Sequence, residues 1–179
     1  LLTDRAYAGA DTWSTAATLG LALKKIGDFD LVLAGRQAID GDTAQTGPNI
    51  AASLDWPHVT FVGKVQKVDE NSIIAERYVE GGCEIVRSTL PVVITVLKDA
   101  NTPRLPSLRG KMKARKIEIP VWGIEDLELN ESEVGLDGSP TRVVKIATPE
   151  IFSNGAIHHA EPEELASLMV DSLLGKDSE

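Results

Sequence analysis

The chain has 179 residues, a formal net charge of −9 and a single cysteine, Cys83. This length allows one hydrophobic core with a small appendage, and the negative charge argues against general nucleic-acid binding. One cysteine excludes a disulfide framework, so we expect a reducing, cytoplasmic compartment. No apolar run approaches the roughly 20 residues that cross a bilayer, so no direct membrane insertion is expected.

Helix and strand signals alternate in the first part of the chain. Asp11 is suited to cap a helix over residues 12–26, where apolar residues recur at helical spacing, and Gly27 is placed to end it. The apolar run Leu31–Gly35 predicts a buried strand, and residues 49–54 predict a second helix. This order indicates an α/β fold with an open, mostly parallel sheet and flanking helices.

A loop rich in small and polar residues, 35–48, joins this strand to the second helix. Strand, loop and helix in this order place a ligand site at the carboxyl end of a strand. Pro48 suits the first helical turn, and unpaired N–H groups around residues 44–47 would lie at the positive end of the helix dipole, a place that suits phosphate. The spacing matches neither GxGxxG nor GxxxxGK[ST], and an ordinary strand-to-helix turn uses the same residue types.

Asp40 and Asp42 lie within this loop. Two carboxylates could bind Mg²⁺, but aspartates at such positions more often fix a turn or contact a ribose. The three histidines, His58, His158 and His159, have no metal-ligand spacing, and no nucleophile motif is present. We therefore expect no metal site, no catalytic residue and no self-sufficient catalyst, and a ligand-binding subunit fits better.

The middle of the chain is rich in strand signals. Residues 59–68, 72–79, 84–90 and 92–97 are separated by turns, and they predict a small antiparallel meander that returns to a buried strand. Cys83 lies here and is expected to be a small core residue.

A basic segment follows at residues 104–116, with six basic residues and no acidic one. Prolines favour a loop in its first half, and Ser107 could cap a short helix over residues 108–116. A solvated basic face is one interpretation. The other is a protein contact surface, because apolar Leu105, Leu108 and Met112 lie among the charges.

The remaining chain is expected to form an extension. Residues 117–122 and 142–147 read as short strands, residues 123–140 as a linker that wraps or extends, and Pro162 starts a C-terminal amphipathic helix. We therefore predict a nucleotide-binding domain over residues 1–122 and an arm with a terminal helix over residues 123–179.

Three segments of the sequence, 4–15, 35–47 and 104–116, together resemble the beta subunit of electron transfer flavoproteins. The resemblance implies an adenine-nucleotide-binding, Rossmann-like α/β domain that pairs with an alpha subunit in a heterodimer. Such a dimer carries electrons between flavin dehydrogenases, such as acyl-CoA dehydrogenase, and a downstream acceptor. The beta site of the family holds AMP or, in the electron-bifurcating branch, a second FAD. Residues 4–15 are closer to the bifurcating type.

Carried over by position, the resemblance assigns two groups of functional residues. The cofactor-binding residues are Asp11, Thr12, Thr15, Asp40, Asp42, Thr43, Ala44, Gln45 and Thr46. The basic segment matches the family's recognition loop, with Leu108 as the leucine that enters a pocket on the dehydrogenase. The expected partner-binding residues are Leu108, Arg104, Arg109, Lys111 and Met112.

Family members begin with further residues before the position of Leu1, so we expect this chain to lack the family's N-terminal segment and part of its nucleotide site. An exposed sheet edge and weak nucleotide binding would follow for the isolated chain. Two alternatives remain open: an adenine-nucleotide-binding regulatory or structural domain without electron transfer, and an interaction module that binds acidic proteins through residues 104–116.

Overall fold

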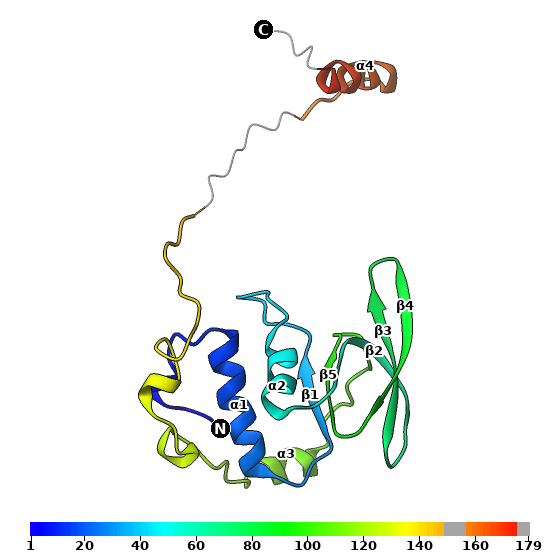
Figure 1. Cartoon of the computed structure of the whole chain (residues 1–179). Coiled ribbons are helices and arrows are strands. Elements are labelled where there is room, and N and C mark those ends of the chain that lie inside the picture. Colours follow the sequence, from blue (N-terminus) through cyan, green and yellow to red (C-terminus); the bar gives the residue numbers. More distant parts are fainter. Residues whose placement is uncertain (149–156, 175–179) are drawn as a thin grey trace. The chain divides into compact units, whose positions relative to one another are not determined.

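The structure is a computed structural model and describes residues 1–148 and 157–174. It divides into one unit at Leu1–Arg142 and a second at Val143–Glu179. The larger unit contains a five-stranded sheet with helices, and the smaller one contains a single described helix (Figure 1). The helices and strands are α1 (Thr12–Ile26), β1 (Leu31–Gly35), α2 (Thr46–Leu54), β2 (His58–Val68), β3 (Ser72–Val79), β4 (Gly82–Thr89), β5 (Val92–Val96), α3 (Leu108–Ala114) and α4 (Pro162–Leu173).

The sheet has the strand order β1-β5-β2-β3-β4. β5 lies parallel to both β1 and β2, while the β2/β3 and β3/β4 pairs are antiparallel. The parallel strands and the antiparallel meander therefore form one continuous sheet. The predicted α/β fold class is confirmed, as are the predicted helix over residues 12–26 and the strand Leu31–Gly35.

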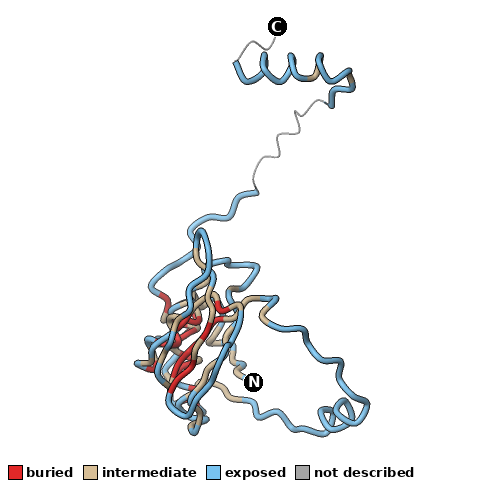
Figure 2. The backbone as a smooth tube through the Cα atoms, turned by 90° about the vertical axis from the view of Figure 1, so that its right-hand side faces the viewer, coloured by how far each residue is buried: buried red, intermediate tan, exposed pale blue. Residues whose placement is uncertain are grey.

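Two apolar clusters hold the sheet and its helices together. On one face, Ala16 of α1 and Ile50, Ala51 and Leu54 of α2 pack against Val93 of β5. The other cluster joins the strands themselves, because neighbours of Val93 in β5, Val92 and Ile94, pack with residues of β2 and β3, namely Val59, Val62, Ile73 and Ala75. Figure 2 shows the buried residues concentrated in this sheet and the helices against it. The alternation along β5 places α1 and α2 against a single face of the parallel part.

Residues 123–140 wrap against the start of the chain. Leu127 and Val134 are buried, and the Ile124 N–H donates to the Asp4 carboxylate at 3.1 Å. A Cβ atom added at Gly135 would lie 2.0 Å from the carbonyl oxygen of Ala6. Residues up to Arg142 therefore belong to the larger compact unit, and the proposed functional boundary at residue 122 stays a prediction.

Three local expectations are wrong. Residues 117–122 form no strand beyond a single parallel bridge between Leu2 and Trp122. Residues 142–147 also form no strand, since no neighbouring segment pairs with their backbone in the described residues. Cys83 does lie in β4 but is exposed, because neither apolar cluster of buried residues extends to a residue of this strand. None of the helices in the described ranges is long and apolar enough to cross a membrane.

Candidate functional site

The loop between β1 and α2 lies at the carboxyl ends of the parallel strands. β1 ends at Gly35, and the next N–H, from Arg36, donates to the carbonyl of Val96 at the end of β5 at 3.1 Å. The chain then leaves the sheet through residues 37–45, which stand out above α2 in Figure 1. This is the edge at which open parallel sheets bind ligands.

Helix α2 begins one residue after Gln45 and offers unpaired N–H groups to this loop. Pro48 has no N–H, and the Asn49 N–H donates to the Gln45 carbonyl at 2.9 Å, so the N–H groups of Thr46 and Gly47 have no acceptor within the helix. The Gln45 side chain does not cap the helix either. The start of α2 is therefore positive and able to bind an anion.

The backbone just before α2 has opposite-handed conformations in succession. Ala44 has a φ of +55°, whereas Gln45 is right-handed with φ −96° and ψ −22°. Such a succession turns consecutive N–H groups into one concavity. Gly47 lets α2 approach the sheet closely, because an added Cβ would lie 2.3 Å from Cγ2 of Thr95. The shape of this turn therefore depends on backbone geometry and on β5.

The side chains of Asp40 and Asp42 accept hydrogen bonds within the loop. Asp40 Oδ1 accepts the N–H of Gly41 at 2.8 Å, and Asp42, with a φ of +53°, accepts a hydrogen bond from the Gln37 side chain. No group of His, Cys, Asp and Glu residues that could hold a metal occurs in the part of the chain that the structure describes. The turn-forming interpretation of the two aspartates is consistent with these contacts.

The start of α1 lies beside this loop. The Thr12 hydroxyl donates to Gln45 Oε1 at 3.1 Å, which joins two segments 33 residues apart in sequence. Thr15 is half-buried in the same first turn. The structure thus brings together the two segments to which the sequence assigned nucleotide contacts.

Asp11 caps α1 and also contacts the far end of the compact unit. Its Oδ1 accepts the Ser14 N–H at 3.0 Å, and its Oδ2 accepts the N–H and hydroxyl of Thr141 at 3.0 and 2.7 Å. Burial raises the pKa of Asp11, but the hydrogen bonds from Ser14 and Thr141 outweigh it and lower the pKa overall. Asp11 is therefore ionised at neutral pH, and both oxygens already have donors.

The basic segment lies elsewhere in the unit. Ser107 caps α3 by accepting the Gly110 N–H at 3.1 Å, and α3 has no buried residue. Leu105, Leu108 and Met112 are 95%, 77% and 55% exposed. Figure 2 shows this whole segment as exposed chain. Of the ion pairs within the described residues, none involves Arg104, Arg109 or Lys111.

Comparison with known proteins decides the family. The electron transfer flavoprotein domain matches residues 1–127. The chain is 46% identical over 174 residues to the electron transfer flavoprotein subunit beta of Thermoanaerobacterium thermosaccharolyticum, covering 97% of this chain and 66% of that protein. It is 43% identical over 177 residues to the caffeyl-CoA reductase-Etf complex subunit CarD of Acetobacterium woodii, covering 98% and 67%. It is 37% identical over 187 residues to protein FixA of Azotobacter vinelandii, covering 97% and 65%.

This chain belongs to the electron transfer flavoprotein family. It spans about two thirds of the length of these relatives. The resemblance noted from residues 4–15, 35–47 and 104–116 is confirmed at the level of family and subunit type.

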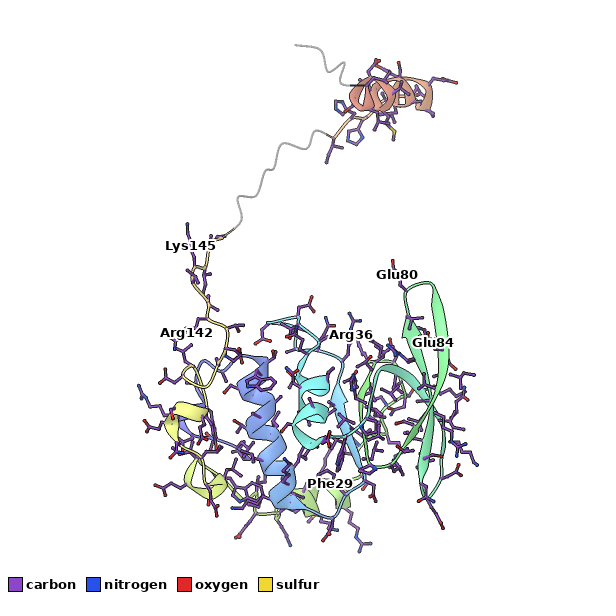
Figure 3. The ribbon with its side chains drawn as sticks, viewed as in Figure 1. Phe29, Arg36, Glu80, Glu84, Arg142 and Lys145 are labelled. Carbon is purple, nitrogen blue, oxygen red and sulfur yellow. The ribbon has the colours of Figure 1, made fainter. Side chains whose placement is uncertain are left out.

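In this electron transfer flavoprotein chain, the predictions from sequence did not include four residues near the expected site. Thr141 and Ser139 bind Asp11 from a segment that read only as linker. The Arg36 guanidinium lies 5.4 Å from the ring centroid of Phe61, whose φ of +57° is unusual for an aromatic residue. Figure 3 shows Arg36 at the same end of the sheet as the loop. Nothing in the spacing of these residues signals that they meet.

Proposed function

We propose that this chain is a nucleotide-binding beta subunit of an electron transfer flavoprotein that pairs with an alpha subunit in the cytoplasm. The observation that carries the proposal is the contact between the two expected nucleotide segments. The Thr12 hydroxyl donates to Gln45 just before α2, where the first N–H groups of the helix have no acceptor within it. A phosphate would accept from the N–H groups of Thr46 and Gly47, and Thr43 and Ala44 lie just before them in the same turn.

The nucleotide is AMP or a second FAD. The segment 4–15 is closer to the electron-bifurcating type, which favours FAD, and one close relative is named as a subunit of a caffeyl-CoA reductase-Etf complex. In either case the cofactor supplies any redox chemistry, and this chain's residues bind and orient its phosphate and ribose.

Electrons would reach the heterodimer from a flavin dehydrogenase that docks on the basic segment. Leu108 and Met112 provide exposed apolar contacts, while Arg104, Arg109 and Lys111 surround them with positive charge. An apolar anchor with charges around it suits fast, transient association.

The test is the nucleotide content of this chain co-purified with an electron transfer flavoprotein alpha subunit. After denaturation, flavin and AMP are quantified per heterodimer by chromatography. Two FAD without AMP supports a bifurcating-type carrier, whereas one FAD with one AMP supports a simple shuttle. A heterodimer without any nucleotide on this chain contradicts the proposed site.

A matched pair of variants locates the nucleotide. Gln45→Ala removes the side chain that meets Thr12 at the start of α2, and Gln66→Ala removes the same side chain from exposed β2. We expect the first variant to lose nucleotide and the second to keep it. Equal retention in both variants would exclude Gln45 from the site.

A further inference from the structure

The last packed residues before Val143 are tied to the start of α1. The N–H of Asp11 donates to Ser139 Oγ at 2.9 Å, and the Ser139 hydroxyl donates to the Gly135 carbonyl at 2.6 Å. The Asp11 carboxylate in turn accepts both donors of Thr141. Three hydrogen bonds thus join Asp11 to Ser139 and Thr141, which lie 128 and 130 positions later in the sequence.

The hydrogen bonds continue from this point into the expected nucleotide site. Thr12 follows Asp11 directly, and its hydroxyl reaches Gln45 Oε1. Gln45 in turn closes the first backbone hydrogen bond of α2 through its carbonyl. A path of neighbouring residues therefore leads from Thr141 through Asp11 and Thr12 to the start of α2.

We propose that Thr141 is a positioning residue of the nucleotide site, which acts by fixing Asp11 so that the start of α1 keeps Thr12 on Gln45. The inference rests on the proposed function, because it assumes that the nucleotide binds at this junction. Thr141 itself does not contact the nucleotide.

Thr141 affects the electrostatics of the site through the Asp11 carboxylate. Asp11 directly precedes Thr12, whose hydroxyl reaches the turn at the start of α2. A carboxylate on this side of the site repels a phosphate, and the repulsion is stronger when the carboxylate is free to rotate toward the phosphate. Oδ2 of Asp11 is held by the two donors of Thr141, and Oδ1 by the N–H of Ser14. Without the hydroxyl of Thr141, Oδ2 has one donor fewer and the Asp11 side chain is freer to rotate. A less ordered site must lose more conformational entropy on binding, so its affinity for the nucleotide is lower.

The coupling must be reciprocal. If Thr141 strengthens nucleotide binding, bound nucleotide strengthens the contact of Thr141 with Asp11 by the same factor. The N–H of Thr141 donates to Asp11, so its amide hydrogen exchange reports the contact directly.

The experiment compares three variants in the heterodimer with an alpha subunit. Thr141→Val removes the hydroxyl and keeps the shape, Thr141→Ser keeps the hydroxyl, and Thr89→Val is the control at an exposed threonine at the end of β4. AMP and FAD are each titrated by calorimetry into nucleotide-depleted protein, and exchange of the Ser14, Thr15 and Thr141 amides is measured with and without nucleotide.

We expect Thr141→Val to weaken nucleotide binding about fivefold, at the low end of couplings between linked sites. Thr141→Ser should restore the affinity, and Thr89→Val should leave it unchanged. Nucleotide should slow exchange at Thr141 in the wild type but not in Thr141→Val.

Two other results are distinguishable. If Thr141→Val lowers the melting temperature but leaves nucleotide affinity unchanged, Thr141 is only structural and the inference is overturned. If the wild-type heterodimer binds neither AMP nor FAD, the proposed function is refuted together with this inference. In that case unchanged exchange at Ser14 and Thr15 in Thr141→Val would separately show that Thr141 does not order the start of α1.

Discussion

Gly47 is the residue at which the shape of the site depends most directly on the packing of the sheet. A methyl group at this position would lie 2.3 Å from Cγ2 of Thr95. Carbon atoms pack at about 3.5–4.0 Å, so the Gly47→Ala variant must move α2 or Thr95 by more than about 1 Å. Thr95 is 2% exposed, and its Oγ1 accepts the Phe61 N–H at 3.0 Å, so rotation of its side chain breaks that hydrogen bond.

The magnitude follows from overpacking in a buried position, which costs about 1–3 kcal/mol. We therefore expect Gly47→Ala to lower the free energy of unfolding by about 2 kcal/mol, measured by denaturant unfolding at neutral pH. Nucleotide binding should fall as well, because displacement of α2 moves the N–H groups of Thr46 and Gly47.

Gly41→Ala is the matched control. No atom lies within 4 Å of a Cβ added at Gly41, which belongs to the same loop and does not have a left-handed φ. Its expected effect is within about 1 kcal/mol and in the stabilising direction, because alanine restricts the unfolded chain.

A second substitution tests the cause. Thr95→Ser removes Cγ2 but keeps the hydroxyl that binds Phe61, so it makes room for the new methyl group. The double variant should be at least about 1 kcal/mol more stable than the sum of the two single effects predicts. Additive effects would refute the contact between residues 47 and 95 as the reason for the glycine.

Three further results are expected. Leu108→Ala should slow reduction of the heterodimer by its dehydrogenase and leave nucleotide content unchanged, since the side chain is 77% exposed; loss of nucleotide would mean that α3 is structural. Ser14→Ala should be neutral or stabilise by up to about 1 kcal/mol in thermal unfolding, because the buried Ser14 hydroxyl has no partner within the described residues; a clear loss of stability would reveal one. The Ala6 and Ile124 N–H groups lower the pKa of Asp4, so the contribution of Asp4 to stability is complete above about pH 3.9 and is lost as the pH falls through the lower folded pKa. Destabilisation by Asp4→Asn should therefore shrink as the pH falls below about 3.9, and an effect that does not depend on pH would contradict this.

The elements of this fold were predictable where local signals are strong. Helix α1 has the expected Asp11 cap and terminal glycine. Its buried face differs from the expected apolar face, because it consists of small residues such as Ala16 and Gly20 while Trp13 and Ile26 are exposed. The expected turns separate β2, β3 and β4, at residues 69–71 and at residues 80–81, the second of them one residue earlier than predicted because Gly82 already belongs to β4. These features depend on neighbours in sequence, which a single chain provides.

The errors have a common physical cause. Residues 117–122 place Ile117, Ile119 and Val121 at alternate positions as a strand does. A strand also needs a neighbour that pairs along its backbone, and within the described residues this segment has a single bridge, from Trp122 to Leu2. Cys83 was expected in the core because cysteine is usually buried, but β4 is an edge strand and lies beyond the buried residues of both apolar clusters. Pairing partners and edge positions are properties of the whole sheet.

The candidate site was predictable only in part, because local signals reveal its segments but not the contacts between them. The loop and the start of α1 were each found from local composition and resemblance, and the hydrogen bond between Thr12 and Gln45 unites them. The role of Thr141 was not foreseeable, because a threonine after Ser-Pro in a linker has no local signature. Its significance comes only from its contact with Asp11.

The two candidate sites lie apart in the larger unit, and this separation has a consequence for function. In Figure 1 the loop before α2 lies above the sheet and α3 lies below it, and Figure 2 shows the exposed segment that carries α3 extending away from the body. None of the hydrogen bonds between described residues links Thr12 or Gln45 with α3. Variants at sites without shared partners usually have additive effects. Combining Gln45→Ala with Leu108→Ala should therefore give the product of the two separate losses in electron-transfer rate. A combined loss much smaller or larger than that product would mean that dehydrogenase docking and nucleotide occupancy are coupled through the sheet.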